Sequence, residues 1–478
     1  MQHVAPRFTP HALLFAAAVL AADAARADDA AAIARIESGL RPAIALAASP
    51  VPTESLAAAM ARLKVPGMSV AVIKDGKVAW SRGYGVAWAG GPAVTPQTLF
   101  QAASVSKPVA AMAALRMVEQ GRLDLDAGID TALTSWRLPD GKGKPTLRQL
   151  LSHTGGMSVS GFPGYAADKS APTLAQVLDG AWAANTRAVR VDAAPGSAFR
   201  YSGGGYTVLQ QAMIDRSGQP FDVLLRESVL APLGMGDSSF AQPLPAASQA
   251  RAARAHDENG KPYRGGAHTY PELAAAGLWT TAQDLARFAL AIQNGAAGGD
   301  NGVISPGMTR TMLTPIMNNY ALGLNIQDDG KGFGHNGANM GFRALMVAST
   351  AGGDGAVILT NGDNGGPLAD SLVRAIAHEY GWSFNQTRLR PAVELSPEQK
   401  KALVGKYEIE GLGGFEIAER DGRLMITNRG APWEPLYAES DTLLFIMSRP
   451  IELRRLDADS GLSVLGSSSR PYKRIGGR

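Results

Sequence analysis

Short apolar runs separated by polar turns lie near both ends of the stretch between residues 60 and 360. The runs "GMSVAVIK" and "KVAWSRGYGVA" flank Asp75-Gly76. Because glycine accepts the positive φ of a tight turn, this pattern predicts a β-hairpin. Three more strands are predicted at residues 333–337, 342–349 and 356–360, separated by glycine-rich turns. We expect the two blocks to form one antiparallel sheet.

Between these blocks the apolar residues follow helical spacing. Helices are predicted over residues 106–120, 206–216 and 282–293. The third follows Thr281, with Asp284 three positions later, which is the spacing of a capping box. Strands at both ends with helices between them favour an α+β fold. We predict an antiparallel sheet flanked by helices, with an inserted helical subdomain.

The pattern changes after residue 385. Residues 386–400 carry proline and charge and are predicted to be a linker. Short strands are predicted beyond it, at residues 415–419, 423–428, 442–447 and 451–456. We therefore expect a larger domain over residues 28–385 and a small all-β domain over residues 401–478. The sequence of the small domain resembles β domains that are often lipocalin-like.

The first residues have the layout of a secretory signal peptide. Arg7 is followed by an apolar run over residues 12–22 and then by Ala25-Arg26-Ala27. We assign residues 1–27 to a signal peptide and expect an exported protein, with the periplasm as the favoured compartment. No later stretch reaches the ~18 unbroken apolar residues of a membrane span, so no transmembrane segment is expected.

Composition narrows the function classes. The chain has no cysteine, which excludes disulfides and thiol chemistry. Its net charge is only +4, and 46 basic and 42 acidic residues are scattered along the chain. Nucleic-acid-binding proteins concentrate basic charge on one face, so no nucleic-acid partner is expected.

The stretch "QAASVSKPV" places Ser104 three residues before Lys107 at the predicted start of a helix. Residues i and i+3 share one helix face, so the amine can reach the hydroxyl. A serine hydroxyl becomes a useful nucleophile when a neighbour takes its proton. The Ser-x-x-Lys spacing alone is weak evidence for a catalytic pair, because a serine that caps a helix and is followed by an exposed lysine has the same sequence.

Two later motifs strengthen this interpretation. "FRYSGGGY" puts Tyr201 before a glycine triplet, and "GHNGANMG" puts His335 and Gly337 on a predicted strand. The order Ser-x-x-Lys, Tyr, polar-x-Gly resembles the serine acyl-transferases of the penicillin-binding-protein and class C β-lactamase superfamily. That group includes D-aminopeptidases, D,D-carboxypeptidases and β-lactamase-like esterases. The phrases "LLSHTGGM", "APLGM", "AAAGLWTTAQDLARF" and "VILTNGD" are also similar to it, and the resemblance covers residues 56–380.

The resemblance implies a role for each matching residue. Ser104 would be acylated, while Lys107 and Tyr201 would share the proton transfers. Which of these two is the general base stays open, because coupled groups titrate as a set. The backbone N–H groups of Ser104 and Ala338 would form the oxyanion hole. The implied substrate-binding residues are His335, Asn336, Gly337 and Ala338.

The chain departs from the family pattern at two places. The tyrosine motif is usually Tyr-x-Asn, but here Gly203 stands in place of the asparagine, for which Asn336 or Asn339 could substitute. His335 stands where class C enzymes have lysine. Since free histidine has a pKa of about 6.5, we expect any preference for substrates with a carboxylate to weaken above roughly pH 7.

No cofactor or metal site is expected. His153 lies in "LLSHTGG" at a predicted helix end, where histidine commonly bonds to local backbone. His378 is not followed by the second histidine of an H-E-x-x-H motif. The absence of G-x-S-x-G disfavours an α/β-hydrolase esterase.

These observations predict an exported serine hydrolase that forms an acyl-enzyme at Ser104. A peptidase or amidase of the D-peptidase type, or a β-lactamase, is favoured. A β-lactamase-like carboxylesterase and a penicillin-binding sensor that does not turn over remain open. Its partner is expected to be a small-molecule, peptide, β-lactam or ester substrate. The sequence does not indicate an oligomeric state.

Overall fold

The computed structural model describes residues 29–428, 431–448, 451–465 and 468–476. The predicted signal peptide, residues 1–27, lies outside the described residues. Contacts divide the chain into two units, one made of residues 59–373 and 382–385 and the other of the remaining residues. The domain limits inferred from the sequence stay predictions.

The first unit is built on a six-stranded antiparallel sheet with the order β3-β2-β9-β8-β7-β6. Its strands are β2 (Gly67–Lys74), β3 (Lys77–Gly85), β6 (Asn325–Gln327), β7 (Gly332–Asn339), β8 (Phe342–Ser349) and β9 (Gly355–Thr360). Strand β2 pairs with β3 on one side and with β9 on the other, so the two sequence blocks form one sheet, as predicted. The short edge strand β6 was not predicted.

The predicted hairpin turn lies between β2 and β3. Asp75 has φ 52° and Gly76 has φ 72°. Positive φ at both central residues is the condition for the type I′ turn that matches strand twist. This turn fixes the register in which Lys74 faces Lys77.

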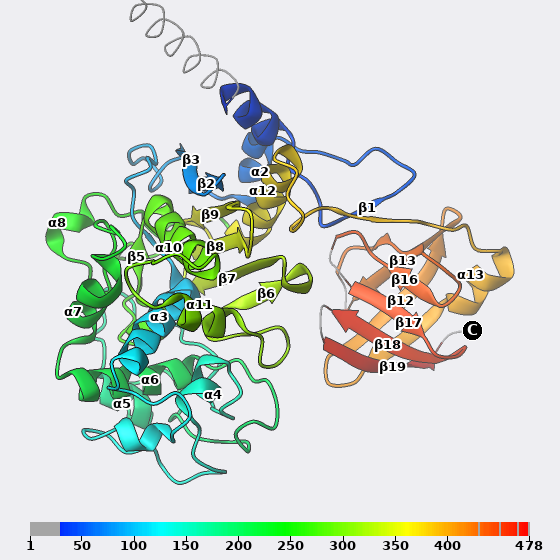
Figure 1. Ribbon diagram of the computed structural model, residues 1–478. Coiled ribbons are helices and arrows are strands. Elements are labelled where there is room, and N and C mark those ends of the chain that lie inside the picture. The colour runs from blue at the N-terminus through cyan, green and yellow to red at the C-terminus, as the bar shows by residue number, and fades with distance from the viewer. Residues whose placement is uncertain (1–28, 429–430, 449–450, 466–467, 477–478) are drawn as a thin grey trace, which may run out of the picture. The chain divides into compact units, whose positions relative to one another are not determined.

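Helices surround the sheet and fill the long insertion between its two blocks (Figure 1). The predicted helices are α3 (Ser106–Glu119), α6 (Gly203–Ser217) and α10 (Ala282–Ala296). Helix α10 packs on β2, β8 and β9, and the Thr281 hydroxyl caps it by accepting from the Asp284 N–H at 3.1 Å. The other helices are α2 (Leu56–Leu63), α4 (Leu147–Leu151), α5 (Leu174–Asp179), α7 (Phe221–Leu225), α8 (Ala246–Gln249), α9 (Leu273–Ala276), α11 (Pro306–Leu313) and α12 (Gly365–Glu379).

The second unit contains a nearly closed, nine-stranded antiparallel sheet, with the order β14-β13-β12-β11-β19-β18-β17-β16-β15. The strands are β11 (Gly405–Ile409), β12 (Gly413–Arg420), β13 (Arg423–Asn428), β14 (Glu434–Pro435), β15 (Tyr437–Ala438), β16 (Leu443–Phe445), β17 (Ile451–Arg455), β18 (Ser460–Leu465) and β19 (Ser468–Gly476). The rings of Tyr407, Phe415 and Tyr472 pack together inside it. The predicted all-β C-terminal domain and the α+β class are therefore confirmed.

The predicted linker contains regular structure. Strand β10 (Arg388–Arg390) pairs in parallel with β1 (Ile44–Leu46), and helix α13 (Pro397–Leu403) follows with a capping box at Ser396. A segment near the beginning of the chain is therefore hydrogen-bonded to a segment that leads into the nine-stranded sheet.

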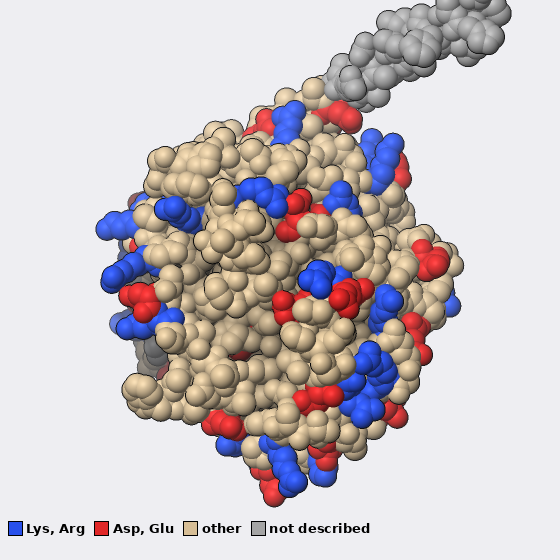
Figure 2. All heavy atoms as spheres, turned by 90° about the vertical axis from the view of Figure 1, so that its left-hand side faces the viewer, with Lys and Arg blue, Asp and Glu red and all other residues tan. Residues whose placement is uncertain are grey.

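Surface charge is mixed on the face shown in Figure 2. Blue and red side chains are interspersed among uncharged ones, without a continuous area of one sign. None of the helices in the described part of the chain is long and apolar enough to cross a membrane.

Candidate active site

Ser104 lies in a 3-10 turn (Ala103–Val105) that joins strand β4 (Phe100–Gln101) to helix α3. Ala103 has φ 49°, a left-handed conformation that is unfavourable for a residue with a side chain. Neighbouring hydrogen bonds hold it there: the Ser106 hydroxyl donates to the Ala103 carbonyl at 2.6 Å and accepts from the Leu278 N–H at 3.0 Å. Such strain persists only where its surroundings impose it, and it is common at functional sites.

Lys107 extends from the first turn of α3 back towards Ser104. Its side chain is 2% exposed, and Nζ donates to the Ser104 hydroxyl at 3.0 Å and to the Ala275 carbonyl of α9 at 2.8 Å. Strand β5 (Trp279–Thr280) pairs with β4, so the chain around α9 is held beside the turn that carries Ser104. The predicted contact between the amine and the hydroxyl is present.

Tyr201 comes to the same place from the start of α6. The centre of its ring lies 5.0 Å from Lys107 Nζ, and the ring of Tyr206 lies 5.7 Å from the same atom. An ammonium group at this distance from an aromatic ring is attracted by the ring's quadrupole. The structure therefore brings together Ser104, Lys107 and Tyr201, although Tyr201 is almost a hundred residues from Ser104 in the sequence.

Strand β7 forms the opposite wall, and Gly337 is the point of closest approach. A Cβ atom at this position would lie 2.2 Å from the Ala102 carbonyl oxygen and 3.1 Å from the Ser104 nitrogen. Only glycine fits here without displacing the backbone. The strand is consequently in direct contact with the turn that carries the serine.

A cavity of about 390 Å³ opens beside these residues. Its lining includes Ser104, Tyr201, Asn336, Gly337 and Ala338, together with residues of β8 and the first turns of α12: Arg343, Ala344, Leu345, Gly366, Ala369 and Asp370. Alternation along paired strands explains this lining, because Asn336 lies opposite Leu345 and Ala338 opposite Arg343 on one face.

His335 points to the other face of β7 and is buried. Its Nε2 accepts from the Tyr320 hydroxyl at 2.9 Å, and its Nδ1–H donates to the Asn336 carbonyl at 2.5 Å. Burial, followed by the charge of Lys107, lowers the pKa of His335 to about 3. The ring is therefore neutral near pH 7. The charge on His335 that underlies the predicted pH dependence of carboxylate preference is therefore not present near pH 7, and the sequence did not indicate which face of the strand His335 occupies.

At position 203, where the family has asparagine, a phenylalanine ring occupies the space next to the backbone. A Cβ atom at Gly203 would lie 2.9 Å from Cε2 of Phe162, so this aromatic ring leaves little space for a side chain there. Of the two predicted substitutes, Asn339 is buried and donates to Gln101 Oε1 at 2.8 Å and to the Ala276 carbonyl at 3.1 Å. Asn336 is exposed and lines the cavity.

Residues 53–380 match the family model described as Beta-lactamase. The chain belongs to the beta-lactamase family. Members of this family include penicillin-binding proteins, esterases and D-peptidases, and they are usually serine hydrolases.

Individual relatives of this beta-lactamase-family chain differ in how much of it they match. Penicillin-binding protein 4 of Amycolatopsis lactamdurans is 28% identical over 376 residues, which cover 73% of this chain and 94% of that protein. Esterase EstB of Burkholderia gladioli is 31% identical over 43% of this chain and 54% of the esterase. The D-alanyl-D-alanine-carboxypeptidase/endopeptidase AmpH of Escherichia coli (strain K12) is 29% identical over 46% of this chain and 56% of that enzyme.

Solved structures support the same fold. The octameric penicillin-binding protein homologue from Pyrococcus abyssi has a TM-score of 0.58 and 23% identity, covering 87% of this chain and 97% of that chain. At this identity the likeness shows the fold alone.

The sequence did not indicate that three residues would lie at or next to this site: Tyr320, His153 and Arg343. Tyr320 has no motif around it, and His153 was expected only to bond to local backbone. Arg343 could have been found from strand alternation, since it faces the cavity beside Ala338. Its guanidinium bonds to Asp363 Oδ1 at 2.9 Å and to the Asn339 carbonyl at 2.7 Å.

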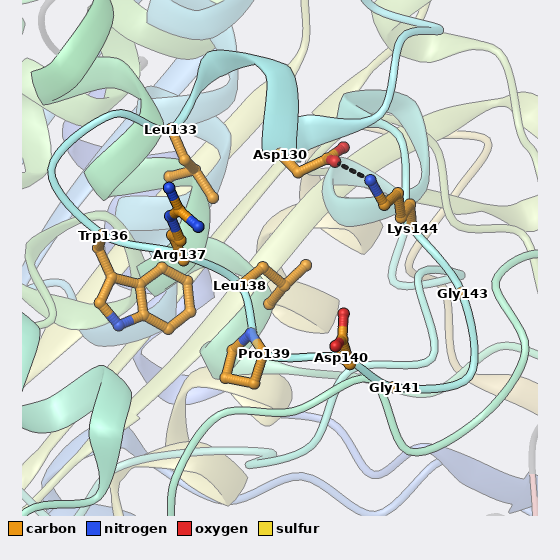
Figure 3. A pocket seen from close by; sticks show the side chains of 10 residues that line it. All are labelled: Asp130, Leu133, Trp136, Arg137, Leu138, Pro139, Asp140, Gly141, Gly143 and Lys144. Carbon is orange, nitrogen blue, oxygen red and sulfur yellow. Dashed lines mark hydrogen bonds and ion pairs between the residues drawn. The ribbon is translucent and has the colours of Figure 1, made fainter.

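A second cavity, of about 500 Å³, lies in the first unit of this protein. It is lined by the loop over residues 130–144 (Figure 3). Two of its charged groups bind each other, since Lys144 Nζ lies 2.5 Å from Asp130 Oδ2. Its lining contains neither Ser104 nor any other residue of the predicted site. We therefore place the candidate active site at the smaller cavity.

Among the described residues, no group of three or more His, Asp or Glu side chains is positioned to hold a metal ion.

Proposed function

We propose that this protein is an exported serine hydrolase that acts through an acyl-enzyme at Ser104. The observation that carries the proposal is the 3.0 Å hydrogen bond from Lys107 Nζ to the Ser104 hydroxyl, at the wall of a cavity that Tyr201 and β7 also line. Export rests on the predicted signal peptide over residues 1–27.

In the acylation step, the Ser104 oxygen attacks the substrate carbonyl carbon. The hydroxyl proton passes to the pair formed by Lys107 and Tyr201, and from there to the leaving group as the carbonyl bond to it breaks. The backbone N–H groups of Ser104 and Ala338 stabilise the negative charge that develops on the carbonyl oxygen. One such donor contributes on the order of 10²–10³ in rate.

In the deacylation step, water attacks the ester formed on Ser104. The same pair accepts a proton from the water and returns one to the serine oxygen, which restores the free enzyme. The Tyr201 ring centre lies 5.0 Å from Lys107 Nζ, so both side chains are close enough to the serine to share these proton transfers.

Amides of D-peptides are the favoured substrates. This choice is supported by the similarity to the D-alanyl-D-alanine-carboxypeptidase AmpH and to penicillin-binding protein 4. β-Lactams have the same type of reacting amide and belong to the same proposal.

A carboxylesterase activity is the second candidate. Gly203 stands where the family has asparagine, and the Phe162 ring fills the space next to it, so the hydrogen bond that would orient an amide side chain of the substrate is missing at this position. Small acyl esters do not need that hydrogen bond, and EstB is an esterase relative.

A substrate panel with two variants tests the proposal. Turnover of a short acyl ester, a cephalosporin, D-Ala-D-Ala peptides and D-amino-acid amides is measured for the wild type, Ser104→Ala and the exposed control Ser170→Ala. We expect Ser104→Ala to lose at least 10³-fold in kcat/KM and the control to match the wild type. Unchanged turnover in Ser104→Ala would eliminate the proposal.

Measuring the intact mass of the protein over time distinguishes a hydrolase from a penicillin-binding sensor that does not turn over. A hydrolase incubated with a fluorescent penicillin or an ester shows an adduct that forms and decays. A sensor without turnover keeps a lasting adduct that is absent from Ser104→Ala.

A further inference from the structure

His153 lies two residues after the end of helix α4, in a backbone conformation that few residues with a side chain adopt. Its φ is 58°, and its side chain is 2% exposed. The residue does not line the cavity beside Ser104. Its position therefore calls for an explanation other than substrate contact.

His153 contacts three consecutive residues that begin at Arg200. Its carbonyl accepts from the Arg200 N–H at 2.8 Å, and its Nδ1 accepts from the Ser202 N–H at 3.1 Å. Its ring centre lies 4.1 Å from that of Tyr201, with the planes tilted by 40°. The backbone and the side chain of His153 together thus hold both residues next to Tyr201 and pack on its ring.

This contact depends on a neutral imidazole. Nδ1 can accept a hydrogen bond only while it carries no proton, which places the ring proton on Nε2. Burial, followed by the charges of Lys107 and His335, lowers the pKa of His153 well below its ordinary value. The other titratable groups that face the ring are Tyr201, Tyr206 and Tyr320. The acceptor is therefore retained throughout the neutral pH range.

The left-handed backbone of His153 is part of the same arrangement. With φ at 58°, the carbonyl of His153 bonds to Arg200 while its ring reaches Ser202. Holding a non-glycine residue in this region is unfavourable, so the surrounding contacts must impose it. A local helix-end bond would account for the N–H contact with Leu150 at 3.3 Å but not for the two bonds to the segment of Tyr201.

We propose that His153 is a positioning residue that sets the Tyr201 phenol against Lys107 and the Ser104 hydroxyl. The proposal rests on the proposed acyl-transfer function of Ser104. Misplacing a catalytic group by about 1 Å can lower the rate on the order of 10²-fold, so loss of this support affects kcat more than KM.

Two variants distinguish the contribution of the Nδ1 hydrogen-bond acceptor of His153 from that of its aromatic ring. His153→Phe keeps an aromatic ring but leaves the Ser202 N–H without its acceptor. His153→Asn supplies an oxygen acceptor, and asparagine tolerates positive φ. Kinetics on the ester are measured per folded molecule, with the folded fraction taken from thermal unfolding, and His378→Asn, an exposed histidine, serves as the control.

We expect His153→Phe to lose about 100-fold in kcat while KM changes less than about threefold, and His153→Asn to recover at least tenfold of that loss. If His153→Phe retains the wild-type kcat, or if His153→Asn is no better than His153→Phe, the proposal is wrong.

A pH profile covers the case in which His153→Phe does not fold. Because His153→Asn lacks the ring packed on the phenol, we expect the alkaline limb of its kcat/KM profile to shift by at least half a pH unit. An unshifted limb together with an unchanged kcat overturns the proposal. Failure of the underlying function is distinguished by Ser104→Ala, which would then retain turnover whatever the His153 variants do.

Discussion

Glu272 is a buried carboxyl group that the proposed mechanism does not use. It immediately precedes α9, whose Ala275 carbonyl binds Lys107, and its side chain is fully buried. Among the described residues, neither of its carboxylate oxygens has a hydrogen-bond partner. Burial raises the pKa of Glu272 from 4.5 to about 7. The protonated form therefore predominates in the folded protein below about pH 7.

This shift predicts a stability that falls as pH rises. A raised pKa in the folded state stabilises the protein fully below 4.5, and the contribution is lost as pH rises through about 7. Glu272→Gln removes the ionisation. We expect the gain in unfolding free energy of Glu272→Gln over the wild type to be roughly 2 kcal/mol larger at pH 8.5 than at pH 5.5.

Chemical denaturation at the two pH values measures this difference. Glu258→Gln, at an exposed position, provides the comparison and is expected to show no such pH dependence. A gain for Glu272→Gln that is the same at both pH values would rule out ionisation of this carboxyl group as the cause.

At the residue scale, local spacing predicted some contacts and not others. The approach of Lys107 to Ser104 follows from helical geometry between residues three apart. The environment of His335 could not be derived, because a one-residue change of register moves every side chain to the other face of a strand. The contacts of His153 with the Tyr201 segment depend on tertiary structure, which no local pattern encodes.

At the element scale, β7 determines how closely the sheet approaches the nucleophile. Gly337 is the residue that allows the contact between β7 and the turn of Ser104. The same strand places Asn336 and Ala338 on the cavity side. The position of the proposed oxyanion hole is therefore a property of the strand as a whole.

Gly337→Ala tests this relation. Its methyl group would lie 2.2 Å from the Ala102 carbonyl oxygen, so β7 or the serine turn must move. We expect kcat/KM to fall on the order of 100-fold. Gly236→Ala, at an exposed position with open space around it, should keep wild-type kinetics. Equal activity of the two variants would show that the close approach is not required.

Strand prediction succeeded where apolar and polar residues alternate around glycine turns. Strands β8 and β9 begin and end within one residue of the predicted limits because both are apolar runs bounded by turns. Strands β6 and β19 were missed, since "NIQ" is too short for a pattern and "SSRPYKRIG" is basic and contains proline. Their pairing partners, not their own sequences, make them strands.

At the scale of the whole molecule, one buried arginine holds strand β10 to the nine-stranded sheet within the second unit. Arg390 is 4% exposed, bonds to Glu439 and lies 3.1 Å from Glu452 Oε1. Its guanidinium also lies 4.4 Å from the centre of the Phe445 ring. The segment that was predicted to be a linker is thus fixed to the β-rich unit by a charged group with little access to water.

Arg390→Ala should destabilise this unit. The substitution removes the ion-pair partner of Glu439 and one of the partners of Glu452, which keeps its pair with Arg454, and we expect a loss of about 2 kcal/mol. Thermal unfolding of the full chain measures the loss. Arg388→Ala is the matched comparison, because the Arg388 side chain is 69% exposed and its pair with Glu452 should contribute less than about 1 kcal/mol. A similar effect of both variants would contradict the role assigned to Arg390.

The arrangement of the six-stranded sheet has a consequence for protein synthesis. Strand β2 needs β9 on one side, and Met68 pairs with Thr360 across 292 residues of chain. At about 5–20 residues per second, the ribosome takes roughly 15–60 s to deliver that partner. During this interval the hairpin of β2 and β3 has an apolar edge without its pairing strand, and we expect incomplete chains to associate through this edge.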